Sequence, residues 1–400
     1  MMDSKLPCLT LNRHAERRLA ALHPWVFSNE IHETERLQRL EPGTVVDVLD
    51  CHGNYAGTGF VNPKSLIAVR ILHRERGLPV DARFFAVRIA SAVRHREAFY
   101  GRDGCYRAVF GESDGLPGLI LDRFGSVLVA EPHAFGMHRM RDLILEGIRE
   151  ALGDLAVVWR TENRGAKLEG IDPRSELVAG ELPSGGVWAV EDGVKIPVDV
   201  MHGQKTGFFF DQRENRTALC RWVAGAARGG SVLDLYCHLG AWGLRALAAG
   251  AGKVTFVDQS REALDGARES ARILGREKDC EFFEGDALQV MKDQSRRSFD
   301  AVVVDPPAFI TSKKTAAQGL KAYAVTNKAA ASLVADGGVL STSSCSFHLE
   351  EPRFEGIVAQ ACWASGRAPR VLRRAAAAFD HPELAGVIET GYLKNLLVGF

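Results

Sequence analysis

The stretch of sequence that decides the fold class is residues 231–258. It begins with Ser231-Val-Leu-Asp-Leu-Tyr-Cys-His-Leu-Gly-Ala-Trp-Gly243 and ends with Lys253-Val-Thr-Phe-Val-Asp258. A buried strand, a glycine-bearing turn, a helix over 243–249 and a second buried strand are expected from this pattern, which is typical of a parallel sheet. The alternation continues with a helix over 260–274 and strands over 280–283, 299–305 and 338–342. We therefore predict a doubly wound, Rossmann-like α/β domain over residues 191–400.

Two further domains are expected before it, because 400 residues exceed one ordinary hydrophobic core. Short apolar runs over 43–50, 55–61 and 66–72, separated by turn residues, predict a compact β-barrel within residues 1–75. Residues 76–190 contain helical patterns over 84–99 and 138–152 and strand patterns over 119–122, 126–130 and 156–160. They are expected to form a central α+β domain.

The overall charge gives no sign of a nucleic-acid partner, since 50 lysines and arginines balance 50 aspartates and glutamates. Any such site must be a local patch. The window from Lys64 to Arg107 holds ten basic residues against four acids. An RNA contact and an ordinary solvated helix face explain this window about equally well.

Eight cysteines are scattered without a CxxC pair or a metal-ligand spacing with histidine. Free thiols in a reducing cytoplasm are expected, with no metal site and no disulfide framework. The N-terminus lacks the apolar segment of a signal peptide, and no apolar run reaches eighteen residues. A soluble cytoplasmic protein without a membrane partner is therefore predicted.

Acidic residues and a glycine stand at three successive predicted strand ends, where ligands of such sheets bind. Asp234 can accept from a cationic amino group, and Gly240 lets the backbone approach a ligand. Asp258 can hold two ribose hydroxyls, and Asp286 could bind an adenine amino group. Each signal is weak alone, but their order favours an adenosine-type cofactor, and a dinucleotide is less favoured because GxGxxG is absent.

The tetrapeptide Asp305-Pro306-Pro307-Ala308 follows the fourth strand of the predicted sheet. Two residues with locked φ make a stiff loop. Such a loop can present Asp305 and backbone carbonyls to a planar base, with Phe309 available for stacking. A tight turn leaving a strand is the structural alternative.

Cys345 lies in the segment Leu340-Ser-Thr-Ser-Ser-Cys-Ser-Phe-His-Leu349, at the end of a later strand. A buried cysteine is usually an inert small apolar residue, as expected here for Cys362. Residues 341–344 are polar and unsuited to a strand that continues into a core, so Cys345 is expected to be accessible. A thiolate at this place could add to carbon-6 of a cytosine or uracil. Cys237, in the first loop, is expected to line the cofactor pocket.

Several motifs together resemble the RlmI-type ribosomal RNA (cytosine-5)-methyltransferases. They are Asp305-Pro-Pro-Ala-Phe309, Ser344-Cys-Ser346, Lys205-Thr-Gly-Phe-Phe-Phe-Asp-Gln-Arg213 and Asp380-His-Pro with Glu389-Thr-Gly-Tyr-Leu-Lys394. The resemblance covers nearly the whole chain. Asn62-Pro-Lys-Ser65 and the strands before it match the N-terminal PUA domain of that family, an RNA-binding barrel, and residues 111–120 match its central domain.

The resemblance implies a class I methyltransferase that uses S-adenosylmethionine (SAM) to form 5-methylcytosine in 23S ribosomal RNA, with a homodimer left open. It assigns Cys345 as the nucleophile and Asp305 as the residue that orients the base. The cofactor-binding residues that it implies are Lys205, Thr206, Asp211, Arg213, Asp234, Tyr236, Gly240, Asp258 and Asp286. The RNA-binding residues are Lys64, Arg70, Pro306, Pro307 and Phe309.

One departure from the family concerns the first loop, where Thr-Gly-Gly-Phe is common and this chain has Leu239-Gly-Ala-Trp242. The shape of the methionine pocket is therefore expected to differ. Two alternatives remain beside the covalent mechanism. One is an RNA methyltransferase acting on a guanine or another base nitrogen, which needs no thiol. The other is a non-catalytic RNA-binding protein that retains the fold.

Overall fold

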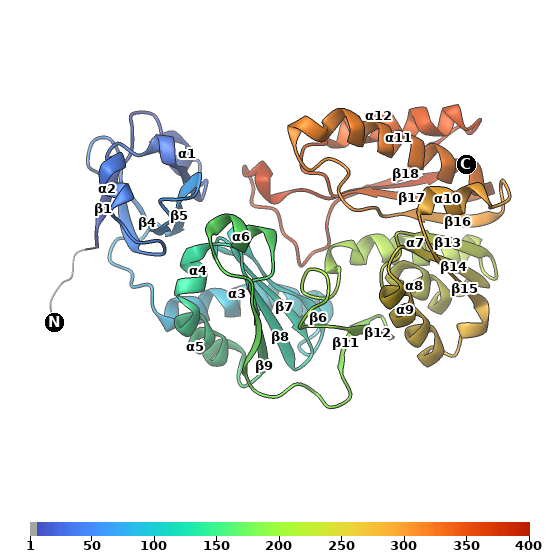
Figure 1. The fold of residues 1–400 in the computed structure, drawn as a ribbon, viewed down its shortest axis with the longest axis horizontal. Coiled ribbons are helices and arrows are strands. Elements are labelled where there is room, and N and C mark those ends of the chain that lie inside the picture. Colours follow the sequence, from blue (N-terminus) through green and yellow to red (C-terminus); the bar gives the residue numbers. More distant parts are fainter. Residues whose placement is uncertain (1–5) are drawn as a thin grey trace. The chain divides into compact units, whose positions relative to one another are not determined.

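The computed structural model describes residues 6–400 and divides into two compact units. The first unit comprises Met1–Val187, Asp199–Phe209 and Asp380–Thr390, and the second comprises Trp188–Val198, Phe210–Phe379 and Gly391–Phe400. Figure 1 shows the elements of both units in chain order. Among the helices of residues 6–400, none combines the length and the apolar composition needed to cross a membrane.

The first unit begins with a five-stranded sheet in the order β1-β3-β4-β5-β2. Its apolar core includes Leu9, Val48, Val61 and Val69, all at most 1 % exposed, because alternate residues of each strand face inward. The strands are β1 (Cys8–Thr10), β2 (Trp25–Phe27), β3 (Val45–Leu49), β4 (Tyr55–Val61) and β5 (Ile67–His73), with helices α1 (Glu16–Ala20), η1 (Ser28–Glu30) and α2 (Thr34–Gln38).

A second five-stranded sheet of the first unit has the order β10-β9-β8-β7-β6. Its strands are β6 (Cys105–Phe110), β7 (Leu119–Phe124), β8 (Val127–Pro132), β9 (Ala156–Arg160) and β10 (Ser175–Ala179). The helices are α3 (Ala82–Tyr100), η2 (Gly111–Asp114), α4 (Phe135–Arg139), α5 (Arg141–Leu152) and α6 (Arg164–Glu169). The helix predicted over 138–152 is divided, since α4 ends before Met140 and α5 begins after it.

The second unit is built on a seven-stranded sheet in the order β15-β14-β13-β16-β17-β19-β18. Strands β13 (Ser231–Leu235), β14 (Lys253–Asp258), β15 (Cys280–Glu284), β16 (Phe299–Val304) and β17 (Val334–Ser344) are parallel, as the sequence predicts. Two antiparallel strands, β18 (Arg370–Ala375) and β19 (Lys394–Gly399), complete the sheet and were not predicted.

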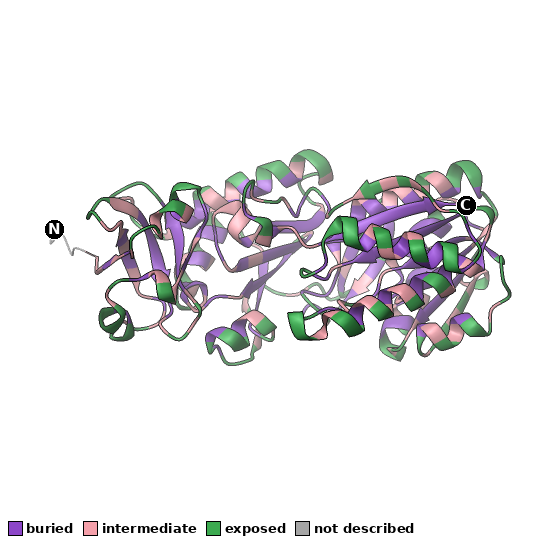
Figure 2. Cartoon of the chain, turned by 90° about the horizontal axis from the view of Figure 1, so that it is seen from above, coloured by how far each residue is buried: buried purple, intermediate pink, exposed green. Residues whose placement is uncertain are grey.

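Helices alternate with these strands, and Figure 2 shows the strands buried while the outer faces of the helices are exposed. The helices are α7 (Arg213–Ala226), α8 (Ala241–Ala248), α9 (Arg261–Ile273), α10 (Ala287–Lys292), α11 (Ala316–Leu333) and α12 (Glu351–Ala364). Short elements are the hairpin β11 (Val187–Glu191) and β12 (Val194–Val198), and the 3₁₀ turns η3 (Phe210–Gln212), η4 (Glu277–Asp279), η5 (Lys313–Thr315) and η6 (Ile388–Thr390). The mixed α/β, Rossmann-like fold class is thereby confirmed.

Candidate active site

Strand order reverses between β13 and β16, which are neighbours although β14 and β15 lie between them in the sequence. The carboxyl ends of parallel strands meet at one edge of a sheet, and ligands bind where the order reverses. Asp234, Asp258, Asp305 and Cys345 all lie in or directly after strands β13, β14, β16 and β17. The second unit therefore brings these four side chains to one edge.

The loop after β13 is held in a strained backbone conformation. Tyr236, His238 and Gly240 have φ of 60°, 49° and 74°, and non-glycine residues rarely adopt such values. Asp258 stabilises the loop by accepting hydrogen bonds from the amides of His238 (2.8 Å) and Ser260 (2.9 Å). A Cβ on Gly240 would lie 2.9 Å from Phe256 and Ala267 side-chain atoms, so only glycine fits. Strain held in this way is typical of ligand-binding loops.

Asp234 is fully buried, and only one of its carboxylate oxygens has a partner. Oδ2 accepts from the amide of Gly243 at 2.9 Å, whereas Oδ1 has no hydrogen-bond partner among the described residues. Burial is the main reason why the pKa of the Asp234 carboxyl is raised to about 8; the charges of Asp305 and Asp258 contribute, and the hydrogen bond from the Gly243 amide opposes the rise. An unpartnered buried acceptor is costly. It fits the cationic amino group of a ligand such as SAM.

Replacing Asp234 with asparagine is expected to weaken SAM binding and to change how stability depends on pH. The pKa is raised from 3.8 to about 8 on folding, so the protonated carboxyl contributes stability that is complete below about pH 4 and is lost as the pH rises through about 8. The free energy of unfolding of the variant relative to the wild type should therefore rise between pH 5 and pH 8. Urea denaturation and calorimetric titration with SAM measure both effects, and a stability difference that is independent of pH would contradict the assignment.

The other predicted cofactor residues of this edge are less enclosed. Asp286 is exposed and caps α10 by accepting from the amide of Gln289 at 3.1 Å. Tyr236 is half-buried, and its ring meets that of Phe309 edge-on with centroids 6.3 Å apart. Their contacts with the cofactor stay predictions.

Asp305 and Cys345, forty residues apart in the sequence, lie at the same place in the structure. The Sγ atom of half-buried Cys345 is 3.9 Å from the carbonyl oxygen of Pro306. Asp305 accepts hydrogen bonds from Gln212 (2.8 Å, to Oδ1) and from the indole of Trp242 (3.0 Å, to Oδ2). Burial raises the pKa of the Asp305 carboxyl, although these two hydrogen bonds oppose the rise. A thiol, a carboxyl and a stiff proline loop therefore meet at one site.

Two donors to Asp305 were not predicted from the sequence. Trp242 is one of the three residues of the first loop in which this chain departs from the family, and its indole N–H supplies a hydrogen bond that phenylalanine lacks. Gln212 lies within the quoted motif of residues 205–213, but only its 2.8 Å approach to Asp305 identifies its role. Both residues hold the carboxyl in one orientation.

The argument that polar residues 341–344 cannot belong to a core strand was wrong. All four are buried within β17, at most 2 % exposed. Ser341, Ser343 and Ser344 bond to side chains from distant parts of the second unit, whereas Thr342 Oγ1 has no hydrogen-bond partner among the described residues. Gln212 and Asn395 donate to Ser343, each at 3.0 Å, and Ser344 donates to the hydroxyl of Tyr323 at 2.8 Å. Cys345 is partly accessible because the strand ends there, not because the segment before it is exposed.

Tyr323 joins the residues on both sides of the cysteine. Its buried hydroxyl lies 2.8 Å from Ser344 Oγ and 2.9 Å from Ser346 Oγ. Ser346 Oγ in turn accepts from the amide of Ile310 at 3.0 Å, which connects the cysteine turn to the loop that follows Asp305. This hydroxyl network positions Cys345 relative to Asp305.

Replacing Tyr323 with phenylalanine is expected to lower kcat for methyl transfer about tenfold without changing the KM for SAM. Removing the hydroxyl loosens both serines while the ring keeps its packing, at a cost of about 1 kcal/mol in stability. Steady-state kinetics measure the effect. Tyr106→Phe is the matched control, because Tyr106 is equally buried in the first unit and its hydroxyl accepts from Arg123. Equal kcat in the two variants would remove the positioning role.

Arg213 and Asp211, predicted to bind the cofactor, have structural partners. Arg213 Nε is 3.4 Å from Glu191 Oε2 within a buried cluster that also contains Arg216 and Arg245. The hydroxyl of Tyr392 donates to Asp211 Oδ2 at 2.5 Å. These contacts account for the burial of both residues, and their predicted contacts with the cofactor stay predictions.

Lys205 and Thr206 belong to the first unit, not to the unit of the four strand-end residues. Thr206 is buried and donates to Asp122, and the ammonium of exposed Lys205 lies 4.0 Å from the centre of the Phe209 ring. Lys205 has a φ of 51°, a further strained position. Their predicted contacts with the cofactor stay predictions.

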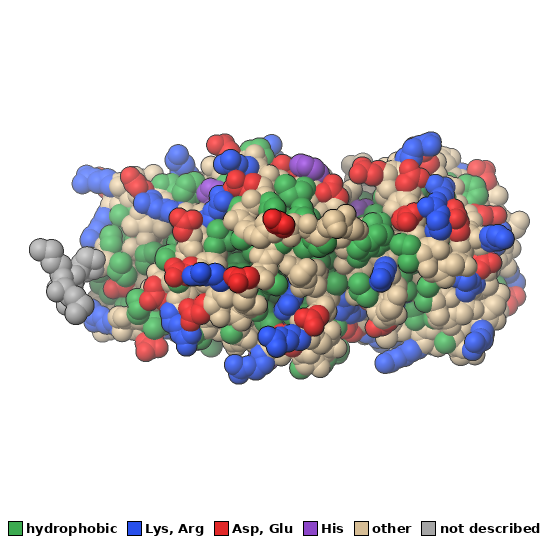
Figure 3. All heavy atoms as spheres, turned by 90° about the horizontal axis from the view of Figure 1, so that it is seen from below, with side chains coloured by type: hydrophobic (Ala, Val, Ile, Leu, Met, Phe, Trp, Pro, Cys, Tyr) green, Lys and Arg blue, Asp and Glu red, His purple; other side chains and the backbone are tan. Residues whose placement is uncertain are grey.

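Arg70, predicted to contact RNA, is held inside the fold by an ion pair, and its contact with RNA stays a prediction. It is 8 % exposed, and its guanidinium is 3.0 Å from Glu169. Arg96 and Arg107 of the same basic window are also buried, paired with Asp114 and Asp122. Three of the ten positive charges of the window are therefore used inside the fold. Lys64 is exposed. Basic and acidic side chains are interspersed over the face in Figure 3.

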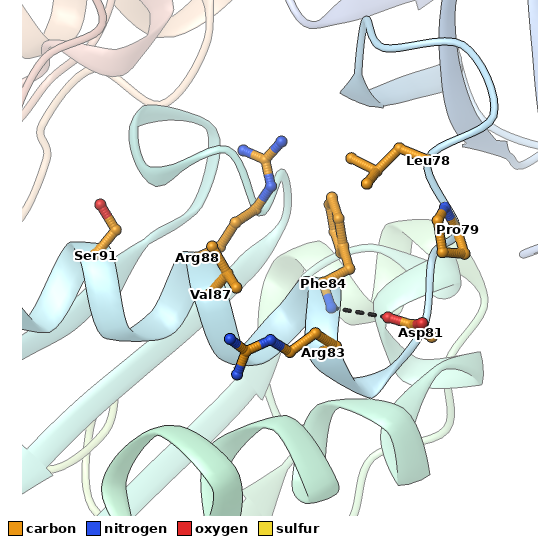
Figure 4. A pocket seen from close by; sticks show the side chains of 8 residues that line it. All are labelled: Leu78, Pro79, Asp81, Arg83, Phe84, Val87, Arg88 and Ser91. Carbon is orange, nitrogen blue, oxygen red and sulfur yellow. Dashed lines mark hydrogen bonds between the residues drawn. The ribbon is translucent and has the colours of Figure 1, made fainter.

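Two further basic residues of the window, Arg83 and Arg88, line a pocket of about 370 Å³ at the start of α3. Figure 4 shows Arg88 beside Phe84, with its guanidinium carbon 4.6 Å from the ring centre. The amide of Phe84 donates to Asp81, which caps the helix. Leu78, Pro79 and Val87 make most of the lining apolar. The pocket holds no group suited to methyl transfer.

Two family models and several curated relatives match this chain. Residues 9–74 match the model of a PUA-like domain, and residues 142–349 match that of S-adenosylmethionine-dependent methyltransferases. The chain is 37 % identical over 387 residues to the ribosomal RNA large subunit methyltransferase I of Shewanella denitrificans, with 96 % of each chain covered. It is 35 % identical over 401 residues to the protein of that name from Klebsiella pneumoniae, covering 99 % of this chain and 98 % of that protein.

Among solved structures, a proposed SAM-dependent methyltransferase from Streptococcus mutans matches with a TM-score of 0.80. The match covers 99 % of this chain and 100 % of that chain at 17 % identity, which shows a shared fold. Another, a proposed methyltransferase complexed with SAH, has a TM-score of 0.81, also at 17 % identity, covering 99 % of this chain and 100 % of that chain. The chain is thus a SAM-dependent methyltransferase by family, and the unpartnered Asp234 and the glycine-dependent loop fit that cofactor.

Proposed function

Because this chain belongs to the ribosomal RNA large subunit methyltransferase I family, we propose that it methylates carbon-5 of a cytosine in large-subunit (23S) ribosomal RNA. The single observation that supports this chemistry best is the position of the Cys345 thiol, 3.9 Å from the Pro306 carbonyl and beside the Asp305 loop. Methylation of a ring nitrogen needs no such nucleophile.

The proposed reaction begins when the target cytosine leaves its stack, at a cost of a few kcal/mol. The Cys345 thiolate adds to carbon-6 and forms a carbon–sulfur bond, while the protonated carboxyl of Asp305, whose pKa burial raises, donates a hydrogen bond to the ring and stabilises the negative charge that develops there. SAM supplies the methyl group when bound. Carbon-5, now electron-rich, takes that methyl group and then loses its proton to a base. The electrons of that carbon–hydrogen bond restore the ring double bond and expel the thiolate.

Binding of RNA is assigned to the N-terminal domain and to exposed basic residues, with Lys64, Pro307 and Phe309 among the proposed contacts. Lys64 is exposed. In the loop that follows Asp305, Pro307 is exposed and Phe309 is half-buried. Single-stranded RNA is bound through phosphate contacts and stacking on such side chains.

The test is to incubate the purified protein with SAM and with large-subunit ribosomal RNA from cells that lack the gene. Digestion to nucleosides and mass spectrometry should then reveal one new 5-methylcytosine per RNA. A methylated guanosine in its place would favour the nitrogen-directed reaction. Absence of any product from protein that binds SAM would exclude ribosomal RNA as the substrate under these conditions.

A further inference from the structure

Two aromatic side chains lie at the surface directly after the proposed nucleophile. Phe347 is 45 % exposed, and His348 beside it is also exposed. Their rings meet edge-on, with centroids 5.4 Å apart and planes at 72°. No role in cofactor binding or methyl transfer accounts for an apolar ring held in solvent at this position.

The segment that carries these rings is anchored on both sides. Ser346 is buried; its carbonyl accepts from Lys394 Nζ (2.7 Å) and from the amide of Leu349 (3.1 Å). Leu349, on the other side of the pair, is 1 % exposed and packs in the core of the second unit. The exposure of Phe347 therefore results from a fixed turn and not from a loose loop, so the ring is preorganised as a contact surface.

The chemistry of such a surface suits an unpaired nucleobase. Extruding one base leaves the neighbouring base without its stacking partner, and single-stranded RNA is commonly bound by stacking bases on phenylalanine and histidine rings. Two residues of backbone span at most about 7 Å. A base held at Cys345 would therefore leave an adjacent base within reach of Phe347.

Resting on the proposed function, we propose that the exposed Phe347 ring, which His348 contacts edge-on, is a stacking platform for a nucleobase next to the target cytosine. The ligand is one unpaired nucleotide of the substrate RNA. Stacking tolerates all four bases, because each has an aromatic face. The platform would thus hold the RNA in place without selecting its sequence.

The experiment compares Phe347→Ala, Phe347→Tyr and Phe347→Trp with the wild type. Methyl incorporation from SAM is measured as a function of the concentration of unmethylated large-subunit ribosomal RNA. For the alanine variant, kcat/KM for RNA should fall about tenfold or more, the size of one lost stacking contact. The tyrosine and tryptophan variants should stay within about threefold of the wild type, because they keep a flat ring.

Trp363→Ala is the matched control, since Trp363 is an aromatic side chain of the second unit that is 64 % exposed on α12. It should methylate RNA like the wild type, and all variants should bind SAM with unchanged affinity, which shows that they are folded.

A Phe347→Ala variant with the kcat/KM of the wild type would overturn the platform, and so would Phe347→Tyr and Phe347→Trp variants as impaired as Phe347→Ala. A defect on ribosomal particles but not on free RNA would overturn it too, in favour of a protein contact. A wild-type protein that forms no 5-methylcytosine contradicts the proposed function instead.

Discussion

Replacing Cys345 with alanine is expected to lower the rate of methyl transfer to ribosomal RNA by at least about 10³-fold, a loss typical for removal of a covalent nucleophile. Without the thiolate, carbon-5 of cytosine is not electron-rich enough to take a methyl group. SAM binding should be unchanged, because Cys345 lies beside the Asp305 loop and not in the loop after β13. Single-turnover incorporation of labelled methyl groups measures the loss.

Cys362→Ala is the control for this experiment. Cys362 is fully buried in α12, and burial raises the pKa of its thiol to about 12, so it cannot supply a thiolate near neutral pH. Its removal should leave the methylation rate at the wild-type level, with only the stability loss of a small cavity. If Cys345→Ala also methylates RNA at nearly the wild-type rate, the covalent mechanism is excluded.

Replacing Glu191 with glutamine is expected to lower the free energy of unfolding by about 3–5 kcal/mol, the usual cost of removing one partner from a buried ion pair. Glu191 is 2 % exposed, and Arg216 Nε donates to it at 2.8 Å. Arg213 and Arg245 are buried around the same carboxylate. Without the negative charge of Glu191, the positive charges of three buried guanidinium groups would no longer be balanced by a carboxylate between them. Denaturation by urea at pH 7 measures the difference.

The same cluster predicts an acid dependence. Burial alone would raise the pKa of Glu191, but the charges of Arg216, Arg213 and Arg245 outweigh burial and lower it from 4.5 to about 2. Because the folded pKa lies below the unfolded value, the stabilisation is complete above about pH 4.5 and is lost as the pH falls through about 2. The difference in the free energy of unfolding between the wild type and Glu191→Gln should therefore narrow as the pH falls from 5 to 2.

Glu281→Gln provides the reference for Glu191→Gln. Glu281 pairs with Lys253 at 2.6 Å, but both side chains are about half exposed. The free energy of unfolding should therefore fall by less than about 1 kcal/mol in Glu281→Gln. Equal losses in the two variants would show that the buried cluster contributes no more than an ordinary surface pair.

The parallel part of the second sheet could be predicted because its strands are buried on both faces and form continuous apolar runs, such as Val302–Val304 in β16. Strand β18 could not, because Arg370, Arg373 and Arg374 interrupt its pattern. Strand β19 begins with Lys394, a charged residue whose buried ammonium donates to the carbonyls of Ser346 and Tyr392. Tertiary pairing decides both elements.

The sequence predicts that Asp305 and Cys345 lie at one edge of the sheet, because each follows a predicted parallel strand and the carboxyl ends of such strands meet at the same edge. The residues that position them could not be found in this way. Gln212 reaches Asp305 and Ser343 over sequence separations of 93 and 131 residues, and Tyr323 contacts Ser344 and Ser346 from the helix α11. Such contacts depend on packing, which no local pattern encodes.

The central claim is that the sulfur of Cys345 bonds to carbon-6 of the target cytosine. The most direct measurement uses large-subunit ribosomal RNA in which 5-fluorocytidine replaces cytidine, incubated with the protein and SAM. Fluorine on carbon-5 cannot leave as a proton, so the final elimination is blocked and the adduct persists. We expect an RNA–protein complex that survives denaturation and carries the RNA on Cys345, seen by mass spectrometry of the digested protein. Formation of 5-methylcytosine in normal RNA without any such complex, or a complex through another residue, would contradict the account.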